Sequence, residues 1–270
     1  MTSSQKVIRY CAIALAIFLA VGIIGGILNA IDLLMGLGSN DAVLEDLKTY
    51  EVSSDVTSLE VLVSASDFYI KEGDEISVES NLKNLEVREK NNKLIIEDKT
   101  KITTSFENAV LILYVPDTAW EEAIITAGAG RFTAETLCAD TLKLELGAGE
   151  VNIKNISVTS NTRIEGGAGA ITVSDGELHN LDMNMGVGQL NLSCSVTGDG
   201  KLNLGVGESN ITLLNEEDDL SVNVEKGLGN LNVNGKDLSK YSTDNNSKDS
   251  LEIHGGVGAI NLKTSEGNNK

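Results

Sequence analysis

Seven Gly-x-Gly tripeptides recur from residue 128 onward, and their spacing constrains the fold more than any other feature of this sequence. The tripeptides begin at Gly128, Gly147, Gly167, Gly186, Gly205, Gly227 and Gly256. The intervals between these positions are 19, 20, 19, 19, 22 and 29 residues. A near-constant period of this length is typical of repeat folds, in which each unit buries its apolar face only by stacking on its neighbours.

The residues on both sides of each tripeptide alternate between apolar and polar, which predicts half-buried strands. Apolar residues stand three positions before the first glycine and four and six positions after it, and Ser209 is the one exception. The residue between the two glycines is also apolar, and we expect it to point inward. These central residues are Ala129, Ala148, Ala168, Val187, Val206, Leu228 and Val257.

A unit with two strands and two corners suits one coil of a parallel β-solenoid, and the glycines give the backbone freedom that one corner needs. We expect the second corner about nine residues further on, at Leu137, Ile156 and Leu214. An antiparallel sandwich is the main rival fold. A sandwich would not require the same residue types at the same register in seven successive copies, so the sequence predicts an all-β, β-helix-like solenoid over residues 55–262.

Other segments are assigned around these repeats. Residues 50–120 show the same alternation without regular glycines, which indicates irregular, earlier coils of the same domain. Residues 234–250 are polar and are expected to be an insertion in the final coil, and residues 263–270 a disordered tail.

The N-terminal segment predicts a single transmembrane α-helix. Residues 10–31 contain 22 uncharged, mostly apolar residues, which as a helix would span ~33 Å at ~1.5 Å per residue. Lys6 and Arg9 precede this span, so residues 1–9 are expected in the cytoplasm, residues 32–54 as a juxtamembrane linker, and the β domain outside the cytoplasmic membrane. Small residues recur at four-residue spacing in the span, and small residues let membrane helices pack closely, so a homodimer through this helix is one possibility. The sequence does not decide whether the anchor is cleaved.

The net charge of the chain limits the class of partner that it is expected to bind. There are 40 acidic and 21 basic residues, for a net charge of −19. Such a surface disfavours the binding of nucleic acid and favours the binding of cationic partners.

Cys138 and Cys194 lie three coils apart, or about 14 Å at ~4.8 Å per coil, whereas a disulfide tolerates a Cα separation of only ~7 Å. We therefore expect these two thiols to be unpaired.

No set of residues indicates a catalytic, metal or cofactor site. The Gly-x-Gly copies lack the lysine of a phosphate loop and the helix of a dinucleotide loop, and the position after them lacks the regular aspartate of calcium-binding β-rolls. Glu145 and Glu165 occupy the same outward position on adjacent coils beside Lys143 and Arg163. Two carboxylates can hydrolyse glycosides, but a lattice of surface ion pairs across neighbouring strands is the simpler interpretation.

A row of polar residues five positions after the first glycine is the best candidate binding face. Thr133, Asn152, Thr172, Asn191, Asn210, Asn232 and Asn261 stand there and are expected to point outward. The amides could hydrogen-bond to one another along the stack, or they could bind an extended glycan or peptide. Both interpretations remain open at the level of sequence.

The stretches SDFYIKEGDEISVES, KLIIED and LILYVPDTAW, followed by ITAGAGRFTAETL, LELGAGEVNIKNI, IEGGAGAITV and LNLGVGESNITLL, resemble a bacterial family of adhesin-like β-strand-repeat proteins known as domain-of-unknown-function family 4097. The resemblance covers about residues 55–262 and implies a cell-envelope solenoid, often tethered by one span, with a role in adhesion or envelope-stress signalling. It implies no catalytic residues. The long insertion at 234–250 departs from the family pattern.

Three functions follow as hypotheses. The first is a non-enzymatic binding or scaffold protein of the bacterial cell envelope, with an envelope protein or a glycan as its partner. The second is a sensor of envelope stress or cationic peptides that signals through the anchor. The third is a carbohydrate-active enzyme using Glu145 and Glu165.

Overall fold

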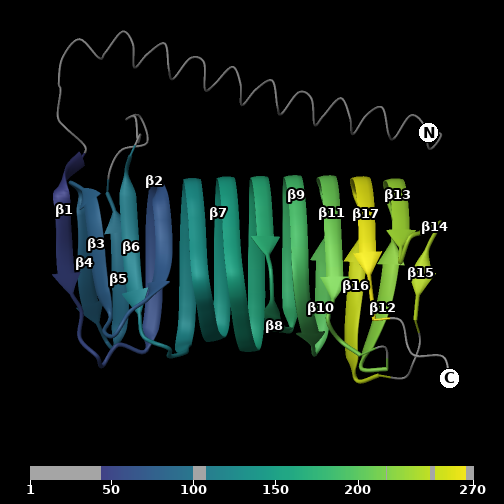
Figure 1. Cartoon of the computed structure of the whole chain (residues 1–270), viewed down its shortest axis with the longest axis horizontal. Coiled ribbons are helices and arrows are strands. Elements are labelled where there is room, and N and C mark those ends of the chain that lie inside the picture. The colour runs from purple at the N-terminus through teal and green to yellow at the C-terminus, as the bar shows by residue number, and fades with distance from the viewer. Residues whose placement is uncertain (1–43, 100–107, 217, 244–246, 266–270) are drawn as a thin grey trace, which may run out of the picture.

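The computed structural model of the chain describes residues 44–99, 108–216, 218–243 and 247–265, and within these ranges the protein is all-β. The strands form one 17-stranded sheet that is wound into stacked coils (Figure 1). The strands are β1 Leu44–Glu51, β2 Ser58–Glu72, β3 Ser77–Leu82, β4 Leu85–Lys90, β5 Lys93–Asp98, β6 Val110–Val115, β7 Trp120–Val173, β8 Gly176–His179, β9 Leu181–Thr197, β10 Asp199–Asn203, β11 Val206–Leu213, β12 Leu220–Glu225, β13 Leu228–Val233, β14 Lys236–Leu238, β15 Tyr241–Ser242, β16 Asp249–His254 and β17 Val257–Lys263.

The coils stack in parallel register, as the repeat predicts. Strand β7 passes through several coils without interruption, and β9 pairs with it in parallel so that Ala168 lies beside Val187 and Thr172 beside Asn191. Strand β11 continues the same register on β9. Equivalent residues of these coils therefore lie next to one another, and the coils succeed one another along the long axis of the molecule (Figure 1).

In the coil that follows Gly128, the interior is lined by three pairs of buried residues rather than two. The pairs are Phe132 and Ala134, then Leu137 and Ala139, then Leu142 and Leu144. Exposed residues separate the pairs, and the inward side of the chain changes at each separation. The expectation of two corners per coil is therefore wrong for this coil, because the chain bends three times to enclose an aliphatic core. Leu214, expected to mark a corner, is 45% exposed.

The glycine corners are sites of close backbone contact between coils. A Cβ atom added to Gly186 would lie 2.2 Å from the carbonyl oxygen of Gly167 in the preceding coil. Gly188 has φ +145, and an added Cβ would lie 1.7 Å from the carbonyl oxygen of Gly169. Side chains are therefore excluded at both positions by the neighbouring coil, and at the second also by backbone conformation.

The residue between the glycines points outward, which corrects the expectation that it is buried. Val187 is 56% exposed and Val206 is 42% exposed, and the alanines at this position are exposed as well. The apolar character of this position is therefore not a sign of the core. It produces an apolar row on the outside of the corner.

The order of the coils along the stack differs from their order in the sequence. Strands β16 and β17 pair on one side with β10 and β11 and on the other side with β12 and β13. The coil of Gly256 is thus inserted between those of Gly205 and Gly227. The polar segment that follows β13 forms the short antiparallel strands β14 and β15, which cover the outer edge of β13 and β12, and the chain then returns into the stack.

The N-terminal part of the domain mixes parallel and antiparallel pairing, so the prediction of a purely parallel solenoid is wrong there. Strand β2 lies parallel to β5, β6 and β7. Strands β1 and β3, β3 and β6, and β4 and β5 pair antiparallel. Hairpins can close over short turns, whereas parallel coils need longer connections. The first described strand, β1, begins inside the segment that the sequence predicts to be a linker.

The predicted transmembrane helix at residues 10–31 lies outside the described residues, as does most of the predicted tail. In the part of the chain that the structure describes, no helix has the length and apolarity needed to span a membrane.

Candidate binding faces

The strongest candidate is a row of side chains that we call the amide row, consisting of Thr172, Asn191, Asn210 and Asn261 on β7, β9, β11 and β17. Asn191 Nδ2 donates to Thr172 Oγ1 over 3.3 Å. Asn210 Nδ2 donates to Asn191 Oδ1 over 3.0 Å, and Asn261 Nδ2 donates to Asn210 Oδ1 over 2.8 Å. The prediction that these amides stack and hydrogen-bond along the coils is confirmed for these four residues. Because the coils hold the same register, one hydrogen bond per coil orients each amide.

The remaining residues of the predicted face are not joined into this row by a described hydrogen bond. Asn152 Nδ2 donates to Glu150 Oε1 on its own strand. Asn232 Nδ2 donates to Asp237 Oδ1, and its Oδ1 accepts from the Gly235 N–H in the β13–β14 hairpin. Asn232 lies at the end of the stack beyond Asn261 because of the inserted coil. Its amide therefore supports a turn.

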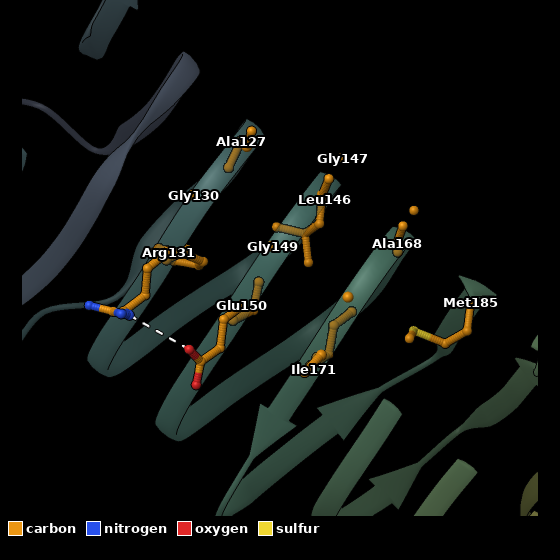
Figure 2. Close-up of a pocket in the computed structure, with 18 of the residues that line it drawn as sticks. Ala127, Gly130, Arg131, Leu146, Gly147, Gly149, Glu150, Ala168, Ile171 and Met185 are labelled. Carbon is orange, nitrogen blue, oxygen red and sulfur yellow. Dashed lines mark ion pairs between the residues drawn. The ribbon is translucent and has the colours of Figure 1, made fainter. Parts of the chain in front are cut away.

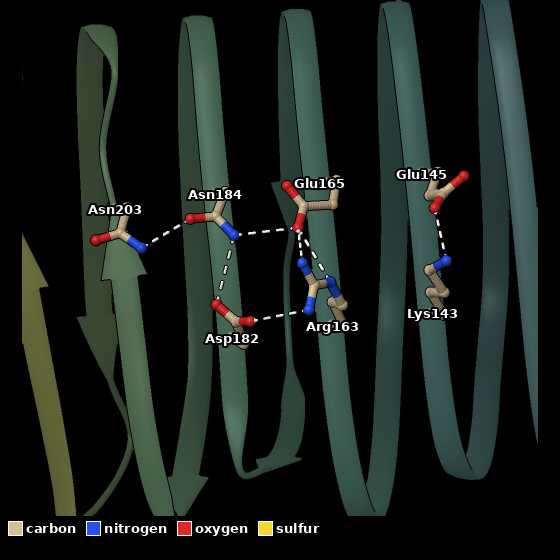
Figure 3. A network of polar contacts seen from close by, with 7 residues as sticks. All are labelled: Lys143, Glu145, Arg163, Glu165, Asp182, Asn184 and Asn203. Carbon is tan, nitrogen blue, oxygen red and sulfur yellow. Dashed lines mark hydrogen bonds and ion pairs between the residues drawn. The ribbon is translucent and has the colours of Figure 1, made fainter.

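A second polar row lies on the strands that enter the glycine corners (Figure 3). Asn203 Nδ2 donates to Asn184 Oδ1 over 2.7 Å, and Asn184 Nδ2 donates to Glu165 Oε1 over 3.1 Å. These two asparagines occupy the repeat position of Glu145 and Glu165. The 19-residue interval could have identified this row from the sequence, but only its glutamates were singled out.

Glu145 and Glu165 form ion pairs with cations two residues away on the same strand, whereas the ion-pair interpretation expects pairs across neighbouring strands. Lys143 Nζ lies 2.7 Å from Glu145 Oε1, and Arg163 Nη2 lies 2.8 Å from Glu165 Oε1 (Figure 3). The hydrogen bond from Lys143 is the main cause that lowers the pKa of Glu145 below its ordinary value. A general acid in glycoside hydrolysis needs a raised pKa, so Glu145 is poorly suited to that role at neutral pH.

A narrow cavity of about 30 Å³ runs beneath the glycine corners of several coils (Figure 2). Its walls include Leu146, Ile171 and Met185, and Ser66 lines one end. Ser66 is 6% exposed, and its Oγ has no hydrogen-bond partner among the residues that the structure describes. A cavity needs roughly 10–15 Å³ to hold one water, so this one has room for solvent and not for an organic ligand.

A wider cavity of about 190 Å³ is lined by residues that include Lys71, Trp120, Thr136 and Cys138. Small-molecule pockets usually exceed ~300 Å³, so this cavity is smaller than a usual ligand pocket. Burial is the main cause that raises the pKa of the Cys138 thiol, and Asp117 adds to it.

Cys138 and Cys194 are both free thiols, which confirms that no disulfide joins them. Burial raises the pKa of Cys194 to about 12. Across the described ranges, no group of three or more His, Cys, Asp or Glu residues is arranged to hold a metal ion. The polar rows therefore remain the candidate binding faces.

The structures that resemble the chain include a proposed cell adhesion protein of Clostridium sporogenes ATCC 15579, with 16% identity, a TM-score of 0.39, and coverage of 82% of this chain and 99% of the other. A proposed adhesin of Bacteroides fragilis NCTC 9343 has 15% identity and a TM-score of 0.42, with coverage of 80% and 95%. At these scores neither likeness indicates what this chain binds. No curated protein matches the sequence.

The sequence profile of one family, Toastrack DUF4097, matches residues 56–268. That range includes all seven glycine corners and both polar rows. The chain therefore belongs to the Toastrack DUF4097 family.

Proposed function

We propose that this protein is a non-enzymatic, adhesin-like binding protein of the bacterial cell envelope, anchored to the cytoplasmic membrane by residues 10–31, and that the amide row binds its ligand. The observation that carries the proposal is the orientation of the row by its own hydrogen bonds. A side chain that is already held in place loses little conformational entropy when a ligand binds. A repeated, pre-oriented set of polar groups, three of them asparagine amides, fits a repeating ligand.

The chemistry of the row favours an extended glycan. An asparagine amide has two N–H donors and a carbonyl oxygen with two lone pairs. Asn210 uses one donor toward Asn191 and one lone pair toward Asn261, which leaves one of each for a ligand. A hydroxyl group both donates and accepts, so sugar hydroxyls match this half-occupied amide better than purely cationic or purely anionic groups do.

The binding test uses the full chain in detergent micelles and purified cell-wall glycan strands as the probe. Asn191, Asn210 and Asn261 are each changed to threonine, the residue that the protein itself uses at this position in Thr172. Three lost hydrogen bonds at roughly 0.5–1.5 kcal/mol each should weaken glycan binding at least tenfold. The matched control changes Asn184 and Asn203 of the second row to threonine. Equal binding by the amide-row variant and the parent would remove this face from the proposal.

A second candidate function is the capture of cationic peptides, and the excess of 40 acidic over 21 basic residues favours it. Its signature is binding that weakens steeply with salt, because exposed charges are screened within ~10 Å at 0.1 M salt. A basic antimicrobial peptide that binds at low salt, and binds equally to the amide-row variant, would favour this sensing function over glycan binding.

The location is tested separately from the ligand. A protease added to intact cells should digest the β domain and spare a tag placed before residue 1, because the anchor leaves only residues 1–9 in the cytoplasm. Digestion that occurs only after cell lysis would contradict the extracytoplasmic assignment and leave the question of ligand binding open.

A further inference from the structure

The residues between the paired glycines form a continuous exposed row that we call the apolar ridge. In spatial order it consists of Ala129, Ala148, Ala168, Val187, Val206, Val257 and Leu228. Val187 is 56% exposed and Leu228 is 47% exposed. The glycines on either side have no side chains to cover the ridge, so it stands free along one edge of the stack. An exposed apolar row of this kind marks an interaction site more often than an isolated exposed residue does.

The ridge has a gradient in side-chain size. The alanines occupy the half nearest the N-terminal coils, and the valines and the leucine occupy the other half. The gradient follows the order of the coils in space, because the inserted coil places Val257 between Val206 and Leu228. A partner that fills the space evenly must therefore present large side chains to the alanine half and small ones to the other half.

We propose that the apolar ridge is a homodimer interface, in which a second copy of this chain packs in antiparallel orientation about a two-fold axis at Val187. The axis brings Ala129 opposite the partner's Leu228 and Ala148 opposite the partner's Val257. Each alanine then meets a branched side chain, and valine meets valine only at the axis. A two-fold interface is self-complementary by symmetry, and the size gradient supplies that complementarity. This interface is distinct from any contact between membrane helices.

The charges beside the ridge select the antiparallel orientation. In this orientation Glu150 lies opposite the partner's Ala259, and Glu145 lies opposite the partner's His254. In a parallel dimer the residues that precede the tripeptides of one copy would face the residues that follow the tripeptides of the other copy. Glu150 would then lie opposite the partner's Glu145 on both sides of the axis. Like charges placed across an interface oppose association, so the parallel arrangement is disfavoured in both size and charge.

The size of the ridge predicts a weak dimer. Six steps of ~4.8 Å give a length of about 29 Å, and three residues of strand give a width of about 10 Å, so each copy contributes roughly 300 Å². A standard interface uses ~800 Å² per partner. Anchoring on one membrane would raise the effective concentration of the copies. The dimer should therefore be captured by crosslinking more readily than by size measurement.

The test uses the full chain in detergent micelles with Cys11 and Cys138 changed to alanine, while the buried Cys194 is kept. Single cysteines replace Val187, Ala129 and, as a control away from the ridge, the similarly exposed Leu214. A short bismaleimide should link two copies of V187C. It should not link two copies of A129C, because the two-fold axis separates these positions by about 29 Å. It should link A148C to V257C when the two chains are mixed.

A second set of variants separates the interface from folding. Adding V187E should reduce the A148C–V257C crosslink at least fivefold while circular dichroism is unchanged, and L214E should leave the crosslink intact. Crosslinking of A129C as strong as that of V187C would overturn the antiparallel arrangement. Absence of crosslinks with freely reactive thiols would overturn the interface. A shielded V187C in a monomeric chain would show that the protein's own residues cover the ridge.

Discussion

The exclusion of side chains at the glycine corners leads to a quantitative prediction for Gly188→Ala. Gly188 combines φ +145 with a Cβ position only 1.7 Å from the carbonyl oxygen of Gly169. Two other glycines each show only one of these two effects. Gly186 has only the close approach, at 2.2 Å to the oxygen of Gly167, whereas Gly235 has φ +80 and nothing within 4 Å of the added Cβ.

The expected cost of Gly188→Ala is the sum of two contributions. The backbone conformation costs about 1–3 kcal/mol for a residue other than glycine. Relieving the contact requires the two coils to separate locally, which weakens about two inter-coil hydrogen bonds at ~0.5–1.5 kcal/mol each. The free energy of unfolding should therefore fall by about 2–6 kcal/mol. Gly235→Ala should cost only about 1–2 kcal/mol, the price of the left-handed conformation alone.

The assay is urea unfolding of the parent and the three variants, followed by the fluorescence of Trp120 and by far-UV circular dichroism. Trp120 is the only tryptophan and is 4% exposed, so its emission reports loss of the core. The two signals must coincide for the free energies to be compared. If Gly188→Ala lies within about 0.5 kcal/mol of Gly235→Ala, below the usual error of additivity, the close contact between coils does not contribute and the reasoning is refuted.

Three further predictions concern single side chains. Ser66→Ala removes a buried hydroxyl that has no partner within the described ranges and should stabilise the protein by about 1 kcal/mol, raising Tm by ~2–4 °C; a lower Tm in calorimetry would contradict this. Asn215→Ala should cost about 1–3 kcal/mol in urea unfolding, because Asn215 bonds both the N–H and the carbonyl of buried Val196 at 2.9 Å; Asn215→Asp, whose second carboxylate oxygen would face the Val196 carbonyl oxygen without a donor, should lose at least as much, and a negligible loss in either variant would argue against paired bonds. Cys194 has a folded pKa of about 12 against an ordinary 9.0, so the folded state holds its proton while the unfolded state loses it. Stability should therefore be complete below pH 9 and fall by about 1.4 kcal/mol per pH unit above it, and the Cys194→Ala variant should show a shallower slope from pH 9 to 11.

Much of the repeat architecture could be predicted from the sequence because it depends on residues close together in the chain. The 19-residue interval places Asn191 and Asn210 in register, and the structure joins them by a hydrogen bond. The separation of Cys138 from Cys194 follows from the same coil count, and both are free. Alternation with period two likewise identifies the buried aliphatic side chains on either side of each tripeptide, since successive side chains of a strand point to opposite faces.

The direction of the central residue of each tripeptide was decided by packing between coils. Val187 continues the apolar alternation, so its sequence context resembles that of a core residue. The neighbouring coil approaches the flanking glycines so closely that the chain must turn there with a backbone conformation open only to glycine. That turn moves Val187 to the outside, and no local pattern records it.

The order of the coils was also decided only by the tertiary structure. The interval of 29 residues before Gly256 is equally compatible with a long insertion in a terminal coil and with a return into the stack. Strands β14 and β15 pair with β13 and β12, so the outer edge is already occupied and β17 instead lies between β11 and β13. A repeat determines which residues are equivalent, since equivalent residues share one register. Which coil neighbours which depends on strand edges far apart in the chain, and only the folded molecule brings those edges together.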